Sequence, residues 1–268
     1  MRFKTALTTK LLDSNLSGEE INLVPSSYQA LDSICLIKLP KELQKCRTLI
    51  AKTILQLYPQ FKSVCAIEKI SGEFRQPHIT LLAGLLPKEV TIRENNCIFK
   101  LNPNTIMYSQ GNHYEKKRVA KIIKENETII DMFAGIGYFS IPIAKSNPTA
   151  NVFAIEKNIE AFRYLQDNTR ANYLPNVFPR MGDSSTTKIP TADRIIMGLI
   201  PSCRQFIPAA MRAARKGTII HYHGLAKSGK EYALLNDFKE YKVKLLKTNI
   251  VKSYKPYTNH VVLDLEVI

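Results

Sequence analysis

The sequence predicts an α/β protein in which a mostly parallel sheet ends in an antiparallel hairpin and follows a small α+β module. First, helix and strand patterns alternate after residue 104, as in a parallel sheet with crossover helices. Second, two glycines separate the first of these strands from its helix. Third, no helix separates the last two strand patterns, which favours an antiparallel pair.

The first hundred residues lack this alternation. Residues 42–57 carry apolar side chains at helical spacing, and residues 1–25 are polar and weakly patterned. Strands are expected at 33–39, 64–70, 79–85 and 97–101. Asn102-Pro103-Asn104 is typical of a boundary. The predicted domains are therefore residues 1–104, a small α+β domain, and residues 105–268, the α/β domain.

Five strand–helix units and two closing strands are expected in the second domain. Its strands are predicted at 128–133, 152–156, 177–181, 194–200, 218–222, 243–251 and 260–268. Its helices are predicted around 119–123 and at 138–145, 159–173, 206–215 and 231–241. In such folds, ligands bind beyond the carboxyl ends of the parallel strands.

A glycine motif follows the first strand of this domain. Residues 131–140 read Asp-Met-Phe-Ala-Gly-Ile-Gly-Tyr-Phe-Ser, and Glu156 comes 19 residues after Gly137. Gly135 and Gly137 permit a sharp turn and a close ligand approach, and the spaced carboxylate can accept bonds from a ribose. The sequence therefore predicts an adenosine-type ligand. The motif is not the dinucleotide form and resembles that of S-adenosylmethionine (SAM) enzymes, so Phe133 is also expected in the cofactor site.

Other polar residues follow the remaining strands at the same edge. Asp183 and Ser184 follow the third strand, and an Asp there can accept a bond from an adenine amino group. The alternative for Asp183 is the aspartate of an Asx-turn. Gly198 and Pro201 follow the fourth strand and are expected to line the acceptor pocket.

Two histidines end the fifth strand. His221 and His223 are two residues apart and therefore share a face. We expect His223 to contact the substrate; the alternative is a hydrogen-bonded core histidine. No third residue has suitable zinc-ligand spacing, so no metal is expected. No Ser-His-Asp or Cys-His arrangement is apparent, so no catalytic residue is assigned; an activated sulfonium needs mainly positioning and electrostatics.

The segment 108–118 is polar and then basic. Ser109 and Lys116 are expected to bind the amino-acid end of SAM, and Asn112 and Arg118 to bind the substrate. The alternative is a solvated linker that leads into a helix.

The charge of the chain favours a polyanion. The formal net charge is +15, and residues 216–255 contain nine lysines and three acidic residues. Such a balance favours RNA or DNA, the alternative being a lysine-rich solvated surface. Five cysteines without C-x-x-C spacing, no membrane-length apolar stretch and no signal-peptide pattern predict a cytoplasmic protein.

Several stretches together resemble a family of tRNA-modifying enzymes. It comprises the tRNA guanine-N1-methyltransferases of archaea and eukaryotes and the related wybutosine-synthesising aminocarboxypropyl transferases. The matching stretches lie within residues 30–268, at 72–77, 82–84, 94–101, 131–142, 192–197, 219–223 and 250–256. The resemblance implies a Rossmann-like SAM-methyltransferase fold, SAM as group donor, and tRNA as partner with contacts from the N-terminal domain. It also assigns cofactor contacts to Ser109, Lys116, Glu156, Asp183 and Ser184, although Lys116 stands where Arg is expected.

Two departures favour the aminocarboxypropyl branch. The methyltransferase branch carries Asn-Leu-Pro after the fourth strand, where this chain has Gly198-Leu-Ile-Pro-Ser. It also carries Ser-Pro-Arg where this chain has Ser109-Gln-Gly. Glycine in place of Asn opens space for SAM to present its Cγ methylene. The resemblance thus implies transfer of the 3-amino-3-carboxypropyl group to C7 of 4-demethylwyosine at position 37 of tRNA(Phe), with release of methylthioadenosine.

Two other functions stay open. One is SAM-dependent N1-methylation of guanine 37 in tRNA. The other is a non-catalytic RNA-binding protein that keeps the fold, against which the intact glycine turn, Glu156 and Asp183 argue. The sequence does not indicate an oligomeric state.

Overall fold

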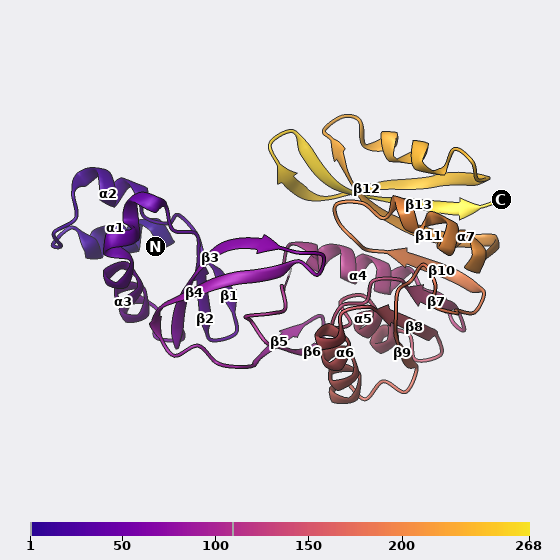
Figure 1. Cartoon of the computed structure of the whole chain (residues 1–268), viewed down its shortest axis with the longest axis horizontal. Helices are drawn as coiled ribbons and strands as arrows, with labels where there is room; N and C mark the ends of the chain where they lie inside the picture. The colour runs from indigo at the N-terminus through magenta and orange to yellow at the C-terminus, as the bar shows by residue number, and fades with distance from the viewer. Residues whose placement is uncertain (1, 109) are drawn as a thin grey trace. The chain divides into compact units, whose positions relative to one another are not determined.

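Two compact units make up the computed structural model, which describes residues 2–108 and 110–268. The first unit runs to Ile92 and adds Lys100–Tyr108; the second contains Arg93–Phe99 and the remainder of the chain. Figure 1 follows the chain from indigo at the N-terminus to yellow at the C-terminus.

A four-stranded sheet, in the order β1-β2-β3-β4, forms the first unit together with its helices. Its strands are β1 (Gln29–Leu31), β2 (Ile34–Ile37), β3 (Ser63–Ser71) and β4 (Gln76–Gly84). Its helices are α1 (Phe3–Leu11), α2 (Gly18–Leu23), the 3₁₀ helix η1 (Lys41–Cys46) and α3 (Arg47–Leu57). β2 and β3 are parallel, and the other two pairs are antiparallel. This confirms an α+β unit ahead of the larger domain.

The helices α1 and α2 lie where no element was expected. In α1, Leu7 and Leu11 are the buried residues, so the apolar stripe is too short to stand out in a polar sequence. In α2, Ser17 and Glu20 form a capping box, a local signal that the sequence does contain. The helix expected at 42–57 also divides, because Cys46 leaves the helical region at φ −101° and ψ 3°.

A short hairpin connects the two sheets along the chain. It pairs β5 (Val90–Glu94) with β6 (Cys97–Leu101), and only β6 was expected. Asn95 and Asn96 both adopt positive φ, at 52° and 60°, as a tight hairpin turn requires.

The second unit is built on a seven-stranded sheet in the order β12-β13-β11-β10-β7-β8-β9. The strands are β7 (Thr128–Asp131), β8 (Asn151–Glu156), β9 (Val177–Met181), β10 (Ala192–Met197), β11 (Ala214–Lys227), β12 (Val243–Lys255) and β13 (Thr258–Val267). β13 is antiparallel to both β11 and β12, and the remaining neighbours are parallel. The parallel sheet with a terminal antiparallel hairpin is thus confirmed.

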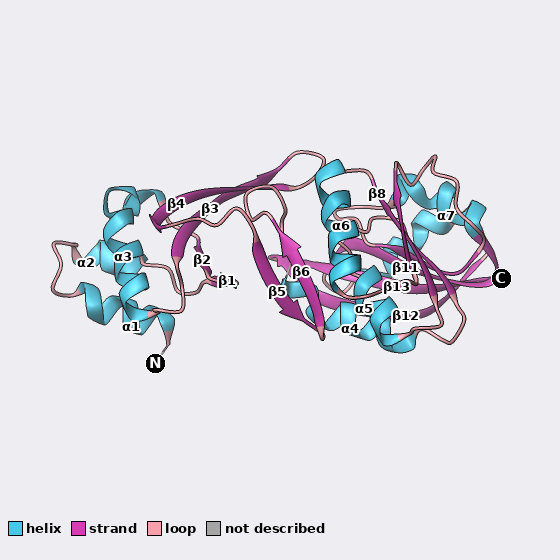
Figure 2. Ribbon diagram, turned by 90° about the horizontal axis from the view of Figure 1, so that it is seen from below, coloured by secondary structure: helices cyan, strands magenta, loops and turns pink. Residues whose placement is uncertain are grey.

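Helices cover both faces of this sheet (Figure 2). α4 (His113–Ile122), α5 (Ser140–Ser146) and α6 (Ile159–Ala171) pack on one face, where Ile129 and Ile196 point. α7 (Ile207–Ala213) and the 3₁₀ helix η4 (Glu231–Phe238) pack on the other, where Ile130 and Ile195 point. Because successive strand residues alternate between two buried faces, the central strands carry consecutive apolar residues, such as Ile129-Ile130 and Ile195-Ile196.

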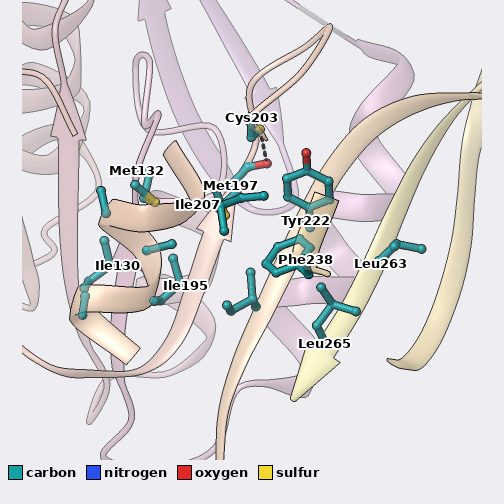
Figure 3. Packing of buried hydrophobic residues seen from close by; sticks show 14 of the residues in the cluster. Ile130, Met132, Ile195, Met197, Cys203, Ile207, Tyr222, Phe238, Leu263 and Leu265 are labelled. Atoms are coloured by element: carbon teal, nitrogen blue, oxygen red, sulfur yellow. Dashed lines mark hydrogen bonds between the residues drawn. The ribbon is translucent and has the colours of Figure 1, made fainter. Parts of the chain in front are cut away.

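The core beneath α7 and η4 contains the largest fully buried side chain, Tyr222 (Figure 3). Its ring meets Phe238 edge-on at 4.9 Å between centroids, and its hydroxyl donates to Asp237 at 2.7 Å. Tyr222 therefore faces away from α4, and its neighbours His221 and His223 face toward the α4 side of the sheet.

Candidate functional site

The glycine turn lies between β7 and α5. Gly135 and Gly137 have φ of 57° and 100°, in the left-handed region that side chains avoid. A Cβ at Gly135 would lie 2.6 Å from the Tyr138 ring, and one at Gly137 would lie 2.5 Å from Ile141. Both conformation and packing therefore require glycine at these two positions.

Glu156, at the end of β8, holds this turn in place. Its Oε2 accepts from the N–H of Gly135 at 2.7 Å, and its Oε1 accepts from the N–H of Asn158 at 2.7 Å. Burial raises the pKa of the carboxyl group, against the lowering effect of these backbone bonds. The backbone of Lys157 also bonds to this carboxylate, and since a carboxylate has about four acceptor sites, it keeps capacity to accept from ribose.

Asp131, which the sequence reasoning did not assign, supports the same turn. It is fully buried, and its Oδ2 accepts from the hydroxyl of Ser140 at 2.6 Å. Burial raises its pKa to about 6. Its position as the first residue of the glycine motif was the signal available in the sequence.

The loop after β9 contains the other two predicted cofactor residues. Asp183 Oδ1 accepts from the N–H of Ser185 at 2.8 Å and from its hydroxyl at 2.6 Å, so the Asx-turn alternative is observed. These bonds, with Lys157 Nζ at 3.2 Å, lower the pKa of Asp183. The buried Ser184 hydroxyl donates to the carbonyl of Met132 and ties this loop to the glycine turn. An adenine contact through Asp183 Oδ2 stays a prediction.

The loop after β10 carries Gly198 and Pro201. A Cβ at Gly198 would meet only the ring of Phe139, at 3.4 Å, and φ there is not left-handed. Neither conformation nor packing therefore requires glycine at this position, in contrast to the turn after β7. The Cys203 thiol lies 2.9 Å from the carbonyl oxygen of Met197, the bond drawn in Figure 3, and 3.0 Å from that of Leu199, so its one S–H is shared between them and folds the loop back.

Lys116 is a buried member of α4. Its side chain is 1% exposed, its Nζ lies 2.6 Å from Glu94 Oε1 and 5.5 Å from the centre of the Tyr138 ring. Burial lowers the pKa of Lys116, and the bond to Glu94 opposes this effect. Lys116 thus connects α4 to the ring that covers Gly135, and a SAM contact through it stays a prediction.

Arg118, two residues further along α4, belongs to an ion network. Its guanidinium donates to Glu115 at 2.8 and 2.7 Å and to Asp264 at 2.8 and 3.0 Å. Its donors bond to two carboxylates of the same unit, and a substrate contact through Arg118 stays a prediction. Helical spacing could not reveal this, because Asp264 is 146 residues away.

The remaining predicted residues lie near the same edge of the sheet or outside the described part. Ser109 lies outside the described residues. Phe133 packs edge-on against Phe206 at 4.8 Å. Asn112 precedes α4, and its Oδ1 is buried without a hydrogen-bond partner among the described residues. His223 Nε2 is likewise buried without a hydrogen-bond partner among the described residues.

The described part of the chain offers neither a metal site nor a membrane span. It holds no group of three or more His, Cys, Asp or Glu residues that could bind a metal. No helix in residues 2–108 and 110–268 is long and apolar enough to cross a membrane.

We expect Glu156→Ala to weaken SAM binding by about 2 kcal/mol, because two charge-assisted bonds to ribose would be lost. The variant also leaves the N–H of Gly135 without its acceptor. Isothermal titration calorimetry with SAM measures the effect, and the thermal midpoint without ligand reports damage to the fold. A folded variant with wild-type affinity would show that the ribose binds elsewhere.

Comparisons with known proteins agree with this geometry. A family model described as the TRM5/TYW2 methyltransferase domain matches residues 90–251, and one described as the TYW2 N-terminal domain matches residues 8–86. A Methanocaldococcus jannaschii protein named tRNA(Phe) (4-demethylwyosine(37)-C(7)) aminocarboxypropyltransferase is 35% identical over 88% of this chain and 96% of its own length.

Two further relatives represent the two branches. The tRNA (guanine(37)-N(1))-methyltransferase Trm5b of Pyrococcus abyssi is 32% identical, over 94% of this chain and 78% of the relative. The crystal structure of P. horikoshii TYW2 in complex with MeSAdo has a TM-score of 0.81 and 30% identity, and the match covers 98% of each chain. From the glycine turn, the sheet order and these matches together, we conclude that this chain belongs to the TRM5/TYW2 family of SAM-dependent tRNA-modifying enzymes.

Proposed function

We propose that the protein transfers the 3-amino-3-carboxypropyl group of SAM to C7 of 4-demethylwyosine at position 37 of tRNA(Phe). The observation that carries this choice is the open position at Gly198. No backbone or packing constraint requires glycine there, so we attribute the missing side chain to the space that the substrate needs. The name of the M. jannaschii relative supports the same choice, as does the Asn that the family resemblance assigns to the methyltransferase branch at this point.

In this reaction SAM is a substrate. A bond forms between C7 and Cγ of SAM, the Cγ–S bond breaks, and its electron pair goes to sulfur, which leaves as methylthioadenosine. C7 then loses its proton. In the proposal, Glu156 and the glycine turn hold the adenosine, and the Gly198 loop leaves room for the Cγ methylene. Positioning of this kind supplies much of the rate enhancement.

The released product tests the proposal. With tRNA from cells that lack the later wybutosine steps, we expect methylthioadenosine in the chromatogram. S-adenosylhomocysteine would instead establish methyl transfer, the activity in the name of the P. abyssi relative. Absence of SAM binding in calorimetry would favour the non-catalytic alternative.

For the RNA partner, we infer a tRNA bound by basic side chains of both units. In the second unit, β12 lies at the edge of the sheet and exposes Lys244, Lys247 and Lys255. Lysines on an edge strand also prevent pairing with another sheet, so they serve solubility as well. The anticodon region of tRNA(Phe) as the bound segment, and a cytoplasmic location, are parts of this proposal.

We expect the affinity for tRNA to fall steeply with salt, because bound lysines release phosphate counterions. Replacing Lys244, Lys247 and Lys255 by Gln should reduce the slope of log Kd against log salt by about 2. Each lost phosphate contact lowers this slope by somewhat less than about one unit. The matched triple Lys→Arg variant keeps the charge and should keep the slope. Filter binding at several salt concentrations measures both. A wild-type slope near zero would contradict an electrostatic tRNA surface.

A further inference from the structure

His223 lies at the carboxyl edge of the sheet, beside the loop that contains Gly198. In the register of β10 and β11, Met197 pairs with Tyr222, which places His223 level with the start of that loop. Ser202, from the same loop, bridges to Gly224. The His223 ring meets Phe139 edge-on at 5.3 Å, and Phe139 is the residue that a Cβ at Gly198 would touch.

The two ring nitrogens of His223 differ in their surroundings. Nδ1 lies 3.0 Å from Nε2 of His260, on the neighbouring strand β13. The His223 side chain is only 1% exposed, and its Nε2 has no hydrogen-bond partner among the described residues. A buried nitrogen without a partner costs free energy, so its place beside the acceptor loop calls for an explanation.

His221 on the same strand provides the contrast. Its Nδ1 lies 2.6 Å from Asp264, and its Nε2 lies 2.9 Å from the guanidinium of Arg194. Both of its nitrogens are therefore satisfied by the protein. The unsatisfied nitrogen is found on the histidine beside the acceptor loop, not on the one further from it.

We propose that His223 Nε2 takes the proton that C7 loses when the new carbon–carbon bond forms, with His260 as the positioning residue. This inference rests on the proposed function. Attack of C7 on Cγ of SAM gives a cationic base that still carries its C7 hydrogen, and methylthioadenosine leaves neutral. The C7–H electron pair then returns to the ring, and the proton goes to Nε2. His223 becomes an imidazolium whose Nδ1–H bonds to His260 Nε2.

The environment keeps both rings neutral before the reaction. Burial, together with repulsion from nearby cationic groups, lowers the pKa of His223 and of His260 to about 3. The ionisable groups that act on the pair are His221, Arg118, Asp264, Lys252 and Glu115. His223 is thus unprotonated at neutral pH and available as an acceptor. A weak base suffices here, because a carbon-bound proton of a cationic ring is strongly acidic.

His223→Asn tests the proposal. The Asn amide can replace Nδ1 in the bond to His260 but has no group at the position of Nε2. We expect kcat to fall on the order of a hundredfold, the size of a general-base contribution, with KM little changed. With acceptor tRNA deuterated at C7, the variant should show a primary isotope effect that the wild type lacks, because proton loss has become rate-limiting.

Matched variants separate this role from a structural one. His221→Asn should lower the thermal midpoint without an isotope effect, because both nitrogens of His221 hold the fold. Added imidazole should partly restore the transfer rate of His223→Ala. If His223→Asn fails to fold, His223→Gln is used for the isotope measurement.

Each outcome bears on one hypothesis. Wild-type protein that releases no methylthioadenosine refutes the proposed function. If the wild type releases it, then a His223 variant with the wild-type rate overturns the inference and leaves Nε2 as a site for a water. A slow variant with neither isotope effect nor imidazole rescue overturns it as well.

Discussion

Asp264→Asn is expected to lower the free energy of unfolding by about 3 kcal/mol, as for loss of one charge from a buried ion pair. Asp264 on β13 accepts two bonds from Arg118 on α4, one from His221 on β11 and one from Asn249 on β12. These bonds connect three strands to the helix that follows segment 108–112. Urea denaturation monitored by circular dichroism measures the change.

The network continues through His221. Arg194 donates to His221 Nε2 at 2.9 Å and makes a two-point ion pair with Glu127 at 2.9 Å for each bond. Since a guanidinium only donates, Nε2 must accept, and Nδ1 must carry the hydrogen that bonds to Asp264. The network therefore selects one tautomer of His221, and burial lowers the pKa of that ring.

The effect of Asp264 should depend on pH. Burial alone would raise the pKa of Asp264, but the bonds from His221 and Arg118 outweigh it and hold the pKa well below its usual range. The folded state thus favours the ionised form. The stabilising contribution of the ionised Asp264 to the free energy of unfolding is fully present above the unfolded pKa of about 4. It is lost as pH falls through the folded pKa.

A surface ion pair provides the control for this prediction. Asp167 and Arg170 pair at 3.0 Å on α6, with side chains 55% and 72% exposed. Asp167→Asn should cost no more than about 0.5 kcal/mol. If both variants changed the free energy of unfolding equally, the assigned network would be contradicted. The same holds if the stability difference between Asp264→Asn and the wild type did not shrink below about pH 4.

Gly198→Asn should impair aminocarboxypropyl transfer about a hundredfold, because a displacement of about 1 Å at the reacting centre has this effect. The added amide would fill the space that Cγ of SAM needs. The fold should tolerate it, because a Cβ at this position meets only the Phe139 ring, at 3.4 Å. SAM affinity should change by less than about 1 kcal/mol, since Glu156 still holds the ribose.

Single-turnover transfer with labelled SAM, measured beside equilibrium SAM binding, tests this prediction. Gly198→Ala adds the Cβ without the amide and is expected to stay near the wild-type rate. We expect no guanosine methylation from Gly198→Asn, because Gln110 and Gly111 also depart from the methyltransferase branch. A Gly198→Asn variant with the wild-type rate would mean that this loop does not choose the transferred group.

The pattern of the second unit was predictable because its signals are local. Each parallel strand is a short apolar run, and the turn glycines and Glu156 lie within 22 residues of one another. Element ends were less predictable. β11 was expected at 218–222 but runs from Ala214, which pairs with Ala192 of β10, to Lys227, which pairs with Thr258 of β13. Residues 231–241 were expected as a helix, and the structure has the 3₁₀ helix η4 there.

The sequence by itself determined the α/β architecture, the glycine turn and the candidate adenosine carboxylate, since backbone conformation and apolar periodicity are set by neighbouring residues. Only the tertiary structure decided which polar side chains are committed to the fold. Lys116 and Arg118 look like free cations in sequence, yet they are held by Glu94 and Asp264, 22 and 146 residues away. The same holds for the histidines: His221 and His223 are equivalent in the pattern of β11. They differ because β13 brings Asp264 to one and His260 to the other, and strand pairing across some 40 residues cannot be read from local spacing.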